Sequence, residues 1–178
     1  MASGLEQLWA GWRNEYVSAA SDSARSGADG ECVFCRIAAA GEATAESGVV
    51  WRGERVLAVL NAYPYASGHL LVLPLRHVGD LAELGPEESG ELWEATRASV
   101  EAITAAYVPD GVNLGANLGR AAGAGIPGHL HLHAVPRWAG DTNFMTSVAG
   151  VRVIPESLTD AWRKLHEAWP KEDQGFTS

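Results

Sequence analysis

The residues in this chain best suited to chemistry are three histidines that alternate with apolar residues. His129, His131 and His133 lie in the segment GHLHLHAVPR and make up half of the six histidines in the chain. Neighbouring side chains along a β-strand point to opposite faces, so an extended segment places the three imidazoles on one face, about 7 Å apart. The alternating Leu130 and Leu132 then face a core. Because buried imidazoles without partners cost free energy, a purely structural role for all three is disfavoured.

Two kinds of catalysis fit this arrangement. An imidazole has an ordinary pKa of about 6.5, so it is largely neutral at cellular pH and can attack phosphorus to give a transient phosphoramidate. In this hypothesis the central ring faces the phosphorus. Alternatively, the three histidines bind a catalytic zinc ion that generates hydroxide for hydrolysis. A third hypothesis is a nucleotide-binding module without turnover, since a fold does not guarantee activity.

A glycine-rich segment leads directly into the histidines and favours the nucleophilic hypothesis. It runs from Asn117 to Pro127 with the sequence NLGRAAGAGIP, and such a loop lets backbone amides approach phosphate oxygens closely. Asn117 and Asn61 each lie at the end of a predicted strand, where a carboxamide can bind a ribose or a phosphate. The alternative role of these two asparagines is turn formation.

Apolar patterning around these residues predicts an α+β fold with an antiparallel sheet. Short apolar runs indicate strands, a period of three to four residues indicates helices, and small polar residues at 18–30 indicate a linker. The expected strands are residues 48–52, 56–61, 69–74, 112–118, 129–135 and 151–154; the expected helices are residues 3–17, 86–107 and a terminal stripe from 158 to 169 that stops at Pro170. We therefore expect an N-terminal helix and linker at 1–30, a main domain at 31–145 and a C-terminal extension at 146–178.

The composition limits the partners of the protein. Hydrophobic residues make up 47% of the 178 residues, which is enough for a packed core, and the formal net charge is −9. That charge would repel a nucleic-acid backbone, and no run of Lys or Arg offsets it. No apolar run approaches the ~20 residues of a membrane span, and no signal peptide is recognisable. We expect a cytoplasmic protein that binds neither nucleic acid polymers nor membranes and holds no organic cofactor.

The two cysteines form a CxxC pair, Cys32 and Cys35. Such a pair is the minimal half of a zinc site, whereas a secreted disulfide framework would use more cysteines further apart. The alternative is that both thiols are simple apolar residues. The pair alone does not decide between these two roles.

With these segments in view, the chain resembles the histidine-triad (HIT) superfamily over about residues 32–144. The matching segments are CVFCRI, LNAYPYASGHLLVLPLRH, NLGRAAGAGIPGHLHLHAVPRW and GDTNF. The chain looks closest to bacterial members that cleave diadenosine polyphosphates, either as hydrolases or as phosphorylases. The resemblance implies a HIT-like antiparallel sheet with an inserted helix. It also implies an enzyme that cleaves dinucleoside polyphosphates or related nucleotide conjugates at the α-phosphate through a nucleotidyl-histidine.

The resemblance further implies a role for each matching residue. His131 would be the nucleophile, His133 would contact the α-phosphate and assist the leaving group, and His69 would support the triad from a neighbouring strand. The residues expected to contact a nucleotide of adenosine type are Asn61, Asn117, Gly123, Ala124, Gly125, Ile126, Pro127 and His133. Gly125 stands where many members have a polar side chain, so the choice between water and inorganic phosphate as acceptor stays open.

Zinc and self-association are the last two features that the resemblance implies. Some zinc-binding relatives combine a CxxC pair with two histidines, and the equivalent residues in this chain are Cys32, Cys35, His77 and His129. A closed Cys2His2 site of this kind is structural, because it leaves no position for a catalytic water. Family members usually form homodimers by joining their sheets, so a homodimer is expected here.

Overall fold

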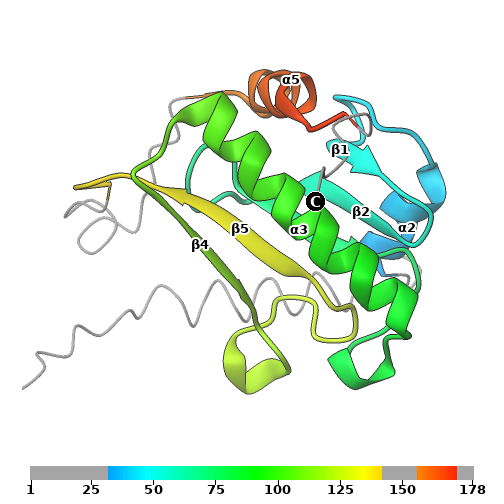
Figure 1. Ribbon diagram of the computed structural model, residues 1–178. Helices are drawn as coiled ribbons and strands as arrows, with labels where there is room; N and C mark the ends of the chain where they lie inside the picture. The colour runs from blue at the N-terminus through cyan, green and yellow to red at the C-terminus, as the bar shows by residue number, and fades with distance from the viewer. Residues whose placement is uncertain (1–31, 142–155, 172–178) are drawn as a thin grey trace, which may run out of the picture.

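The computed structural model describes residues 32–141 and 156–171. These residues form one antiparallel sheet with helices on both faces (Figure 1). In chain order the elements are α2 (Val33–Ala40), β1 (Val49–Arg52), β2 (Val56–Leu60), β3 (Leu70–Pro74), the 3-10 turn η1 (Leu81–Glu83), α3 (Pro86–Tyr107), β4 (Gly111–Ala116), the 3-10 turn η2 (Arg120–Ala122), β5 (Leu132–Arg137) and α5 (Leu158–Ala168). The α+β class predicted from the sequence is confirmed.

The strand order β1-β2-β3-β5-β4 places the histidine segment next to the start of β3 and the end of β4. The chain returns after α3, so β5 is inserted between β3 and β4 and pairs antiparallel with both. In this register His133 lies opposite Leu71 of β3 and Gly115 of β4. His69, immediately before β3, and the residues that follow β4 are therefore neighbours of the histidine segment.

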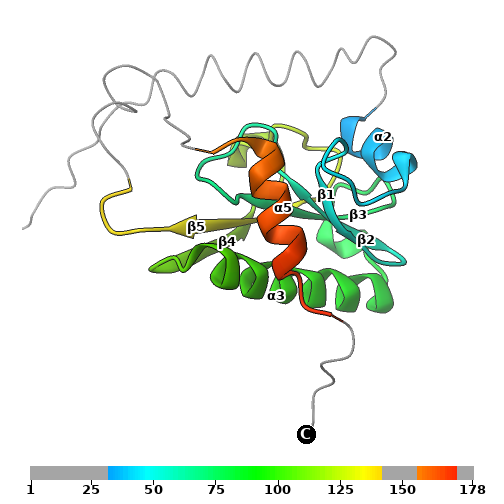
Figure 2. The same cartoon turned by 90° about the horizontal axis from the view of Figure 1, so that it is seen from above.

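Each face of the sheet has its own apolar core, which explains why β2 and β3 are apolar throughout. Figure 2 shows α3 against one face and α2 on the other. On the α3 side, Leu70 and Ala134 pack with Ile103 of α3 and Leu165 of α5. On the α2 side, Phe34 packs with residues of β2 and β3. The C-terminal helix therefore contributes to the same core as the strands.

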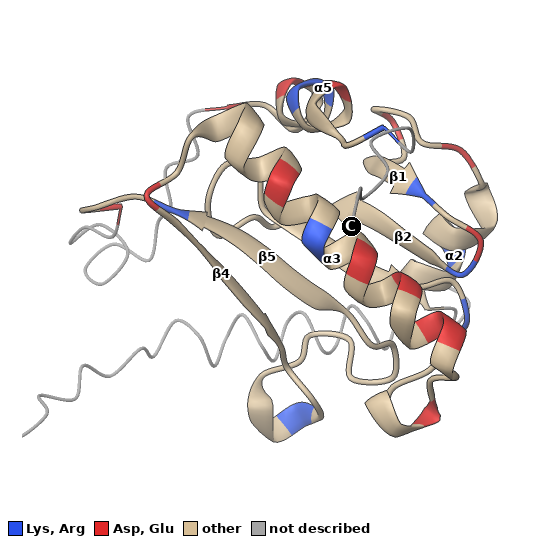
Figure 3. Ribbon diagram, in the orientation of Figure 1, with Lys and Arg blue, Asp and Glu red and all other residues tan. Residues whose placement is uncertain are grey.

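Helix α3 matches the predicted range of 86–107 residue for residue. Pro86 occupies the first turn, and Glu87 and Glu88 follow it, where acidic side chains interact favourably with the helix dipole. Arg76 donates to Glu88 at 2.8 Å and so links that turn to the segment after β3. Acidic residues recur along α3, whereas β2 and β3 contain no charged residue and β5 carries only Arg137, at its end (Figure 3).

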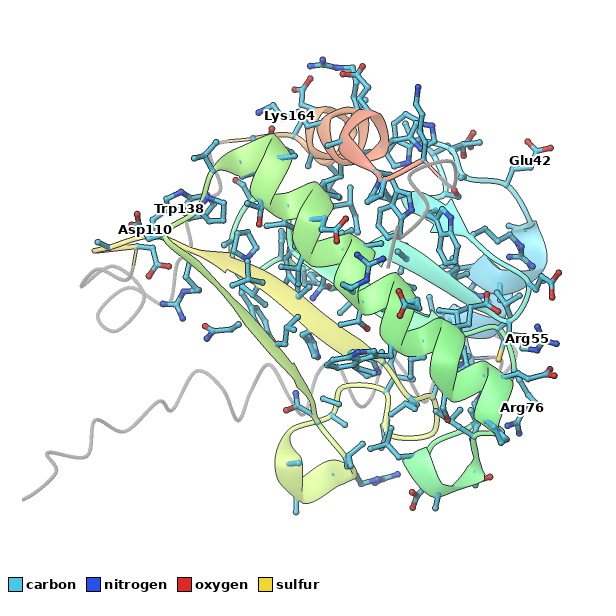
Figure 4. The ribbon with its side chains drawn as sticks, in the orientation of Figure 1. Glu42, Arg55, Arg76, Asp110, Trp138 and Lys164 are labelled. Carbon is cyan, nitrogen blue, oxygen red and sulfur yellow. The ribbon has the colours of Figure 1, made fainter. Side chains whose placement is uncertain are left out.

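The far end of the sheet, where α3 ends and β4 begins, is closed by polar and aromatic contacts. Trp138 and Asp110 lie beside each other there (Figure 4). The Trp138 ring packs edge-on against Tyr107 with 6.4 Å between the centroids, and Asp110 accepts from the backbone of Ala139 at 2.7 Å. Trp138 therefore has a packing role at this end.

The sequence-based boundaries were wrong at the histidines. The predicted strand 129–135 is observed as Leu132–Arg137, so only His133 belongs to the ladder. The Pro74 carbonyl accepts from the ring of His129 at 2.8 Å instead of continuing the ladder, and the backbone N–H of Leu130 donates to Val78. The helix α2 was not predicted at all. The predicted helix at 3–17, the linker at 18–30 and the strand at 151–154 lie outside the described residues.

Candidate active site

His131 is held with one ring nitrogen free for attack. The side chain is buried, with 7% of its surface exposed, and its Nδ1 lies 2.8 Å from the backbone oxygen of His129. Since a carbonyl oxygen can only accept, Nδ1 carries the proton and Nε2 carries the lone pair. Burial lowers the pKa of His131, so this neutral form is the one present at neutral pH.

His133 presents the opposite group, an N–H, to the same region. The backbone N–H of Tyr65 donates to Nδ1 of His69 at 3.1 Å, so the proton of His69 is on Nε2. That Nε2 lies 2.9 Å from Nδ1 of His133, which accepts, and the proton of His133 is therefore on its own Nε2. This N–H is buried and has no hydrogen-bond partner among the described residues. Burial, and secondly the neighbouring His131, lower the pKa of His133 to about 4.

Aromatic rings fix the orientation of these imidazoles. The rings of His131 and His133 meet at an angle of 61°, with centroids 5.1 Å apart. The ring of Phe34 packs against that of His131 with 5.1 Å between the centroids, and the ring of Tyr65 stacks on that of His133 with 5.9 Å between the centroids. Neither Phe34 nor Tyr65 was predicted from the sequence to belong to the site. Phe34 could have been suspected because it lies inside the CxxC pair, and Tyr65 because it lies four residues before His69.

The predicted nucleotide-binding residues lie on two segments that meet near the histidines. Ala116 pairs with Leu132, so Asn117 follows β4 at the level of His131. Asn61 follows β2, and its Nδ2 lies 3.3 Å from Nδ1 of His69. In the predicted loop 123–127, Gly123 adopts a left-handed backbone with φ of 87°, which favours glycine. A Cβ atom added at Gly125 would meet no atom within 4 Å, so this part of the loop leaves room for a ligand.

Four predicted metal ligands form a second cluster beside the histidines. The ligand atoms of Cys32, Cys35, His77 and His129 all lie within 4.8 Å of one another. Nδ1 of His129 is 3.4 Å from the sulfur of Cys32, and Nδ1 of His77 is 3.3 Å from that of Cys35. The bond from His129 Nε2 to the Pro74 carbonyl places the proton on Nε2 and leaves Nδ1 free to bind a metal. Two cysteines, bound as thiolates, and two imidazoles are a donor set that fits a tetrahedral zinc ion.

The zinc-hydroxide hypothesis, which used His129, His131 and His133 as ligands, is disfavoured by this geometry. Nδ1 of His129 faces the two sulfurs, and Nδ1 of His131 donates to a carbonyl. Among the residues that the structure describes, the potential metal ligands that cluster in a group of three or more are the two cysteines and two histidines of the Cys2His2 set, and not the three triad histidines. This geometry leaves Nε2 of His131 as the ring nitrogen that could act as a nucleophile.

Comparison with known proteins assigns the chain to a family. The sequence model of the HIT domain matches residues 42–140. An "AP-4-A phosphorylase" of Mycobacterium tuberculosis is 41% identical over 171 residues, which cover 94% of this chain and 86% of that protein. An uncharacterised HIT-like protein of Saccharolobus solfataricus is 32% identical over 64% of this chain and 79% of its own length.

Solved structures agree with this assignment. A zinc-bound histidine triad family protein from Mycobacterium smegmatis superimposes with a TM-score of 0.62 and 30% identity, covering 78% of this chain and 92% of that one. A hypothetical histidine triad nucleotide-binding protein from Sulfolobus tokodaii gives a TM-score of 0.62 at 29% identity, covering 77% of this chain and 91% of that one. With more than half of its residues matched by the HIT domain and with 41% identity to a relative covered almost throughout, this chain belongs to the HIT family.

Proposed function

We propose that the protein is a nucleotidyl-transferring enzyme that cleaves dinucleoside polyphosphates at the α-phosphate through a covalent intermediate on His131. The observation that supports the proposal is that neighbouring rings present two complementary groups: a lone pair on Nε2 of His131, and an N–H on Nε2 of His133 that has no hydrogen-bond partner among the described residues. A nucleophile and a donor on adjacent rings suit attack on phosphorus with stabilisation of its oxygens. The name of the M. tuberculosis relative supports the substrate class.

In the first step Nε2 of His131 attacks the α-phosphorus. The new N–P bond forms as the P–O bond to the departing phosphate chain breaks, and the electron pair leaves with that oxygen. The His133 N–H would donate a hydrogen bond to the oxygen that gains charge. The backbone N–H groups of Gly125 and Ile126 would bind the other phosphate oxygens, since those of Gly123 and Ala124 already donate to backbone carbonyls and Pro127 has none. The ring of His131 becomes positively charged, and the His129 carbonyl stabilises this charge through the proton on Nδ1.

In the second step an acceptor attacks the same phosphorus from the side that the leaving group vacated. The N–P bond breaks and its electron pair returns to Nε2 of His131, which restores the neutral ring. We propose inorganic phosphate as the acceptor, because the M. tuberculosis relative is named a phosphorylase and covers 94% of this chain. The small residues Gly123 and Gly125 leave space for such an anion.

The acceptor can be tested with diadenosine tetraphosphate. With phosphate present, the proposal predicts ADP and ATP in equal amounts, because phosphate captures the adenylyl group and ATP is the first leaving group. In phosphate-free buffer the rate should fall at least about 100-fold, since the second step lacks its acceptor. Product analysis by ion-exchange chromatography measures both. Equally fast release of AMP and ATP without phosphate would instead identify water as the acceptor.

We propose that a structural zinc ion occupies the cluster of Cys32, Cys35, His77 and His129. The support is the donor set, the free Nδ1 of His129, and the zinc-bound relative from M. smegmatis. When bound, zinc would tie α2 to the segments around His77 and His129. The residues of the chain that perform the reaction are separate from this cluster, apart from the backbone oxygen of His129.

We further propose that the protein is a cytoplasmic homodimer joined along β4. Among the described residues β4 pairs with β5 alone, and it exposes 47% of Leu114. A free sheet edge with an exposed apolar residue favours pairing with a second copy. Trp93, with 61% of its surface exposed on α3, offers a further apolar contact. None of the described helices is long and apolar enough to cross a membrane.

A further inference from the structure

Asn61 lies where the sequence predicts a contact to the nucleoside, yet the protein itself engages both ends of its carboxamide. Its Oδ1 accepts from the backbone N–H of Tyr63 at 3.0 Å, and its Nδ2 lies 3.3 Å from Nδ1 of His69. Because a backbone N–H can only donate, the first bond fixes which end of the carboxamide is oxygen. The amide nitrogen therefore faces the His69 ring.

The ring of His69 accepts two donors on one nitrogen. Nδ1 receives the backbone N–H of Tyr65 at 3.1 Å and the amide of Asn61 at 3.3 Å. The ring is fully buried, and in the neutral imidazole the two donors place the single proton on Nε2. Neither the backbone N–H of Tyr65 nor the amide of Asn61 can accept a proton from this nitrogen, so both groups disfavour the other tautomer. An acceptor at the same position would favour it.

The position of this single proton decides which group the catalytic site presents. With the proton on Nε2, His69 donates to Nδ1 of His133 at 2.9 Å, and His133 presents an N–H to the substrate. With the proton on Nδ1, the hydrogen bond between His69 and His133 would reverse, the backbone N–H of Tyr65 would face a second N–H, and His133 would present a lone pair. A lone pair facing a phosphate oxygen repels it, so the transition state would lose its donor.

We propose that Asn61 is a positioning residue that reinforces the backbone N–H of Tyr65 in holding the tautomer of His69 and, through it, the proton on His133. This inference rests on the proposed function for its catalytic consequence. This role differs from that of a nucleoside contact. Turnover would depend on the Nδ2 of Asn61 being a hydrogen-bond donor, independently of how tightly the nucleotide binds.

The variant Asn61→Asp separates the two roles. Aspartate keeps an oxygen for Tyr63 and for a ribose hydroxyl, so a residue that only contacts the nucleoside would tolerate it. At the His69 ring, however, it replaces a donor with a charged acceptor. We expect kcat for diadenosine tetraphosphate to fall at least about 10-fold, as for loss of an oriented proton donor, with KM changed by no more than about threefold. An unchanged kcat with a raised KM would overturn the proposal.

Nitrogen-15 NMR of the histidine rings supplies a second readout that needs no substrate. In the unmodified protein His69 should show an unprotonated Nδ1 and a protonated Nε2, and His133 should show the same pattern. In Asn61→Asp the proton should move toward Nδ1 of His69. Protonation of His69 at Nδ1 in the unmodified protein would contradict the proposal even if the variant failed to fold. If the protein cleaved no dinucleotide, the proposed function would fail while this tautomer remained measurable.

Asn113→Asp provides the matched control. Asn113 is an exposed residue of β4 whose Oδ1 accepts from Arg137 at 2.9 Å, and a carboxylate preserves that contact. The same chemical change at this position should leave kcat, KM and the His69 resonances as they are. Equal losses in both variants would show that added negative charge, and not the His69 contact, causes the effect, and the proposal would then be wrong.

Discussion

Replacing His131 with alanine should lower turnover of diadenosine tetraphosphate by at least about 1000-fold, because it removes the proposed nucleophile. Nε2 of His131 is the free nitrogen of a neutral ring, whereas His133 directs an N–H toward the same region. Loss of the central ring therefore removes the nucleophile and leaves only the donor. Steady-state assays with phosphate present measure the effect.

Two further variants show whether this loss is chemical. His131→Asn retains a polar side chain of smaller volume and should still bind the nucleotide, as measured by calorimetry with a non-cleavable analogue. His166→Ala removes a histidine of α5 that bonds to the backbone of Val50, away from the triad. This control should keep its turnover. If His131→Ala turned over at close to the normal rate, a different residue would have to be the nucleophile.

The second large effect is expected at the Cys2His2 cluster. Cys35→Ser should abolish zinc binding, since the sulfur of Cys35 lies near both His77 and His129. Without the metal, α2 loses its tie to the two histidine segments. We expect the free energy of unfolding to fall by roughly 3 kcal/mol, which corresponds to a fall in Tm of about 10 °C for a protein of this size. Metal analysis and thermal denaturation measure the two outcomes.

The chelator experiment provides the control for this variant. A strong chelator should lower the Tm of the unmodified protein to that of Cys35→Ser and should leave the variant where it is. The protein purified without chelator should contain close to one zinc ion per chain. A protein that contains no zinc, or a Tm that neither treatment changes, would rule out the metal site and would leave two thiols with a packing role.

The proposed zinc site would also influence catalysis, through the backbone carbonyl group of His129. The backbone oxygen of His129 accepts the Nδ1 proton of His131, and the ring of His129 is a proposed zinc ligand. The ring of Phe34 contacts both histidines, at 5.4 Å and 5.1 Å between centroids. Loss of the metal in Cys35→Ser should therefore reduce kcat as well as stability, although by less than His131→Ala.

Much of this arrangement could be predicted because the relevant patterns are local. The apolar runs of β2 and β3 are buried throughout, and Pro86 with its acidic neighbours marks the start of α3. The four metal ligands were named from the CxxC pair and the family resemblance, and the structure brings them within 4.8 Å of one another. The contact between His69 and His133 likewise follows the expected neighbouring strands.

Other features depend on long-range contacts that no local pattern reveals. The histidine segment was predicted to be a strand from residue 129, but the ring of His129 takes the Pro74 carbonyl that a regular ladder would use. Helix α2 is only eight residues long and is stabilised by packing of Phe34 and Ala38 on the sheet, and so short a segment is too brief for its apolar spacing to indicate a helix. The direction of the His69–His133 hydrogen bond depends on Tyr65 and Asn61, whose positions only the folded chain defines.

The most direct test of the account is to look for the covalent intermediate itself. The protein is mixed with diadenosine tetraphosphate in phosphate-free buffer, quenched within the first turnover, digested and examined by mass spectrometry. The account predicts an adenylyl group on the peptide that contains His131, which disappears when phosphate is added before the quench. Product formation with no adduct, or with the adduct on another residue, would contradict the central role of His131.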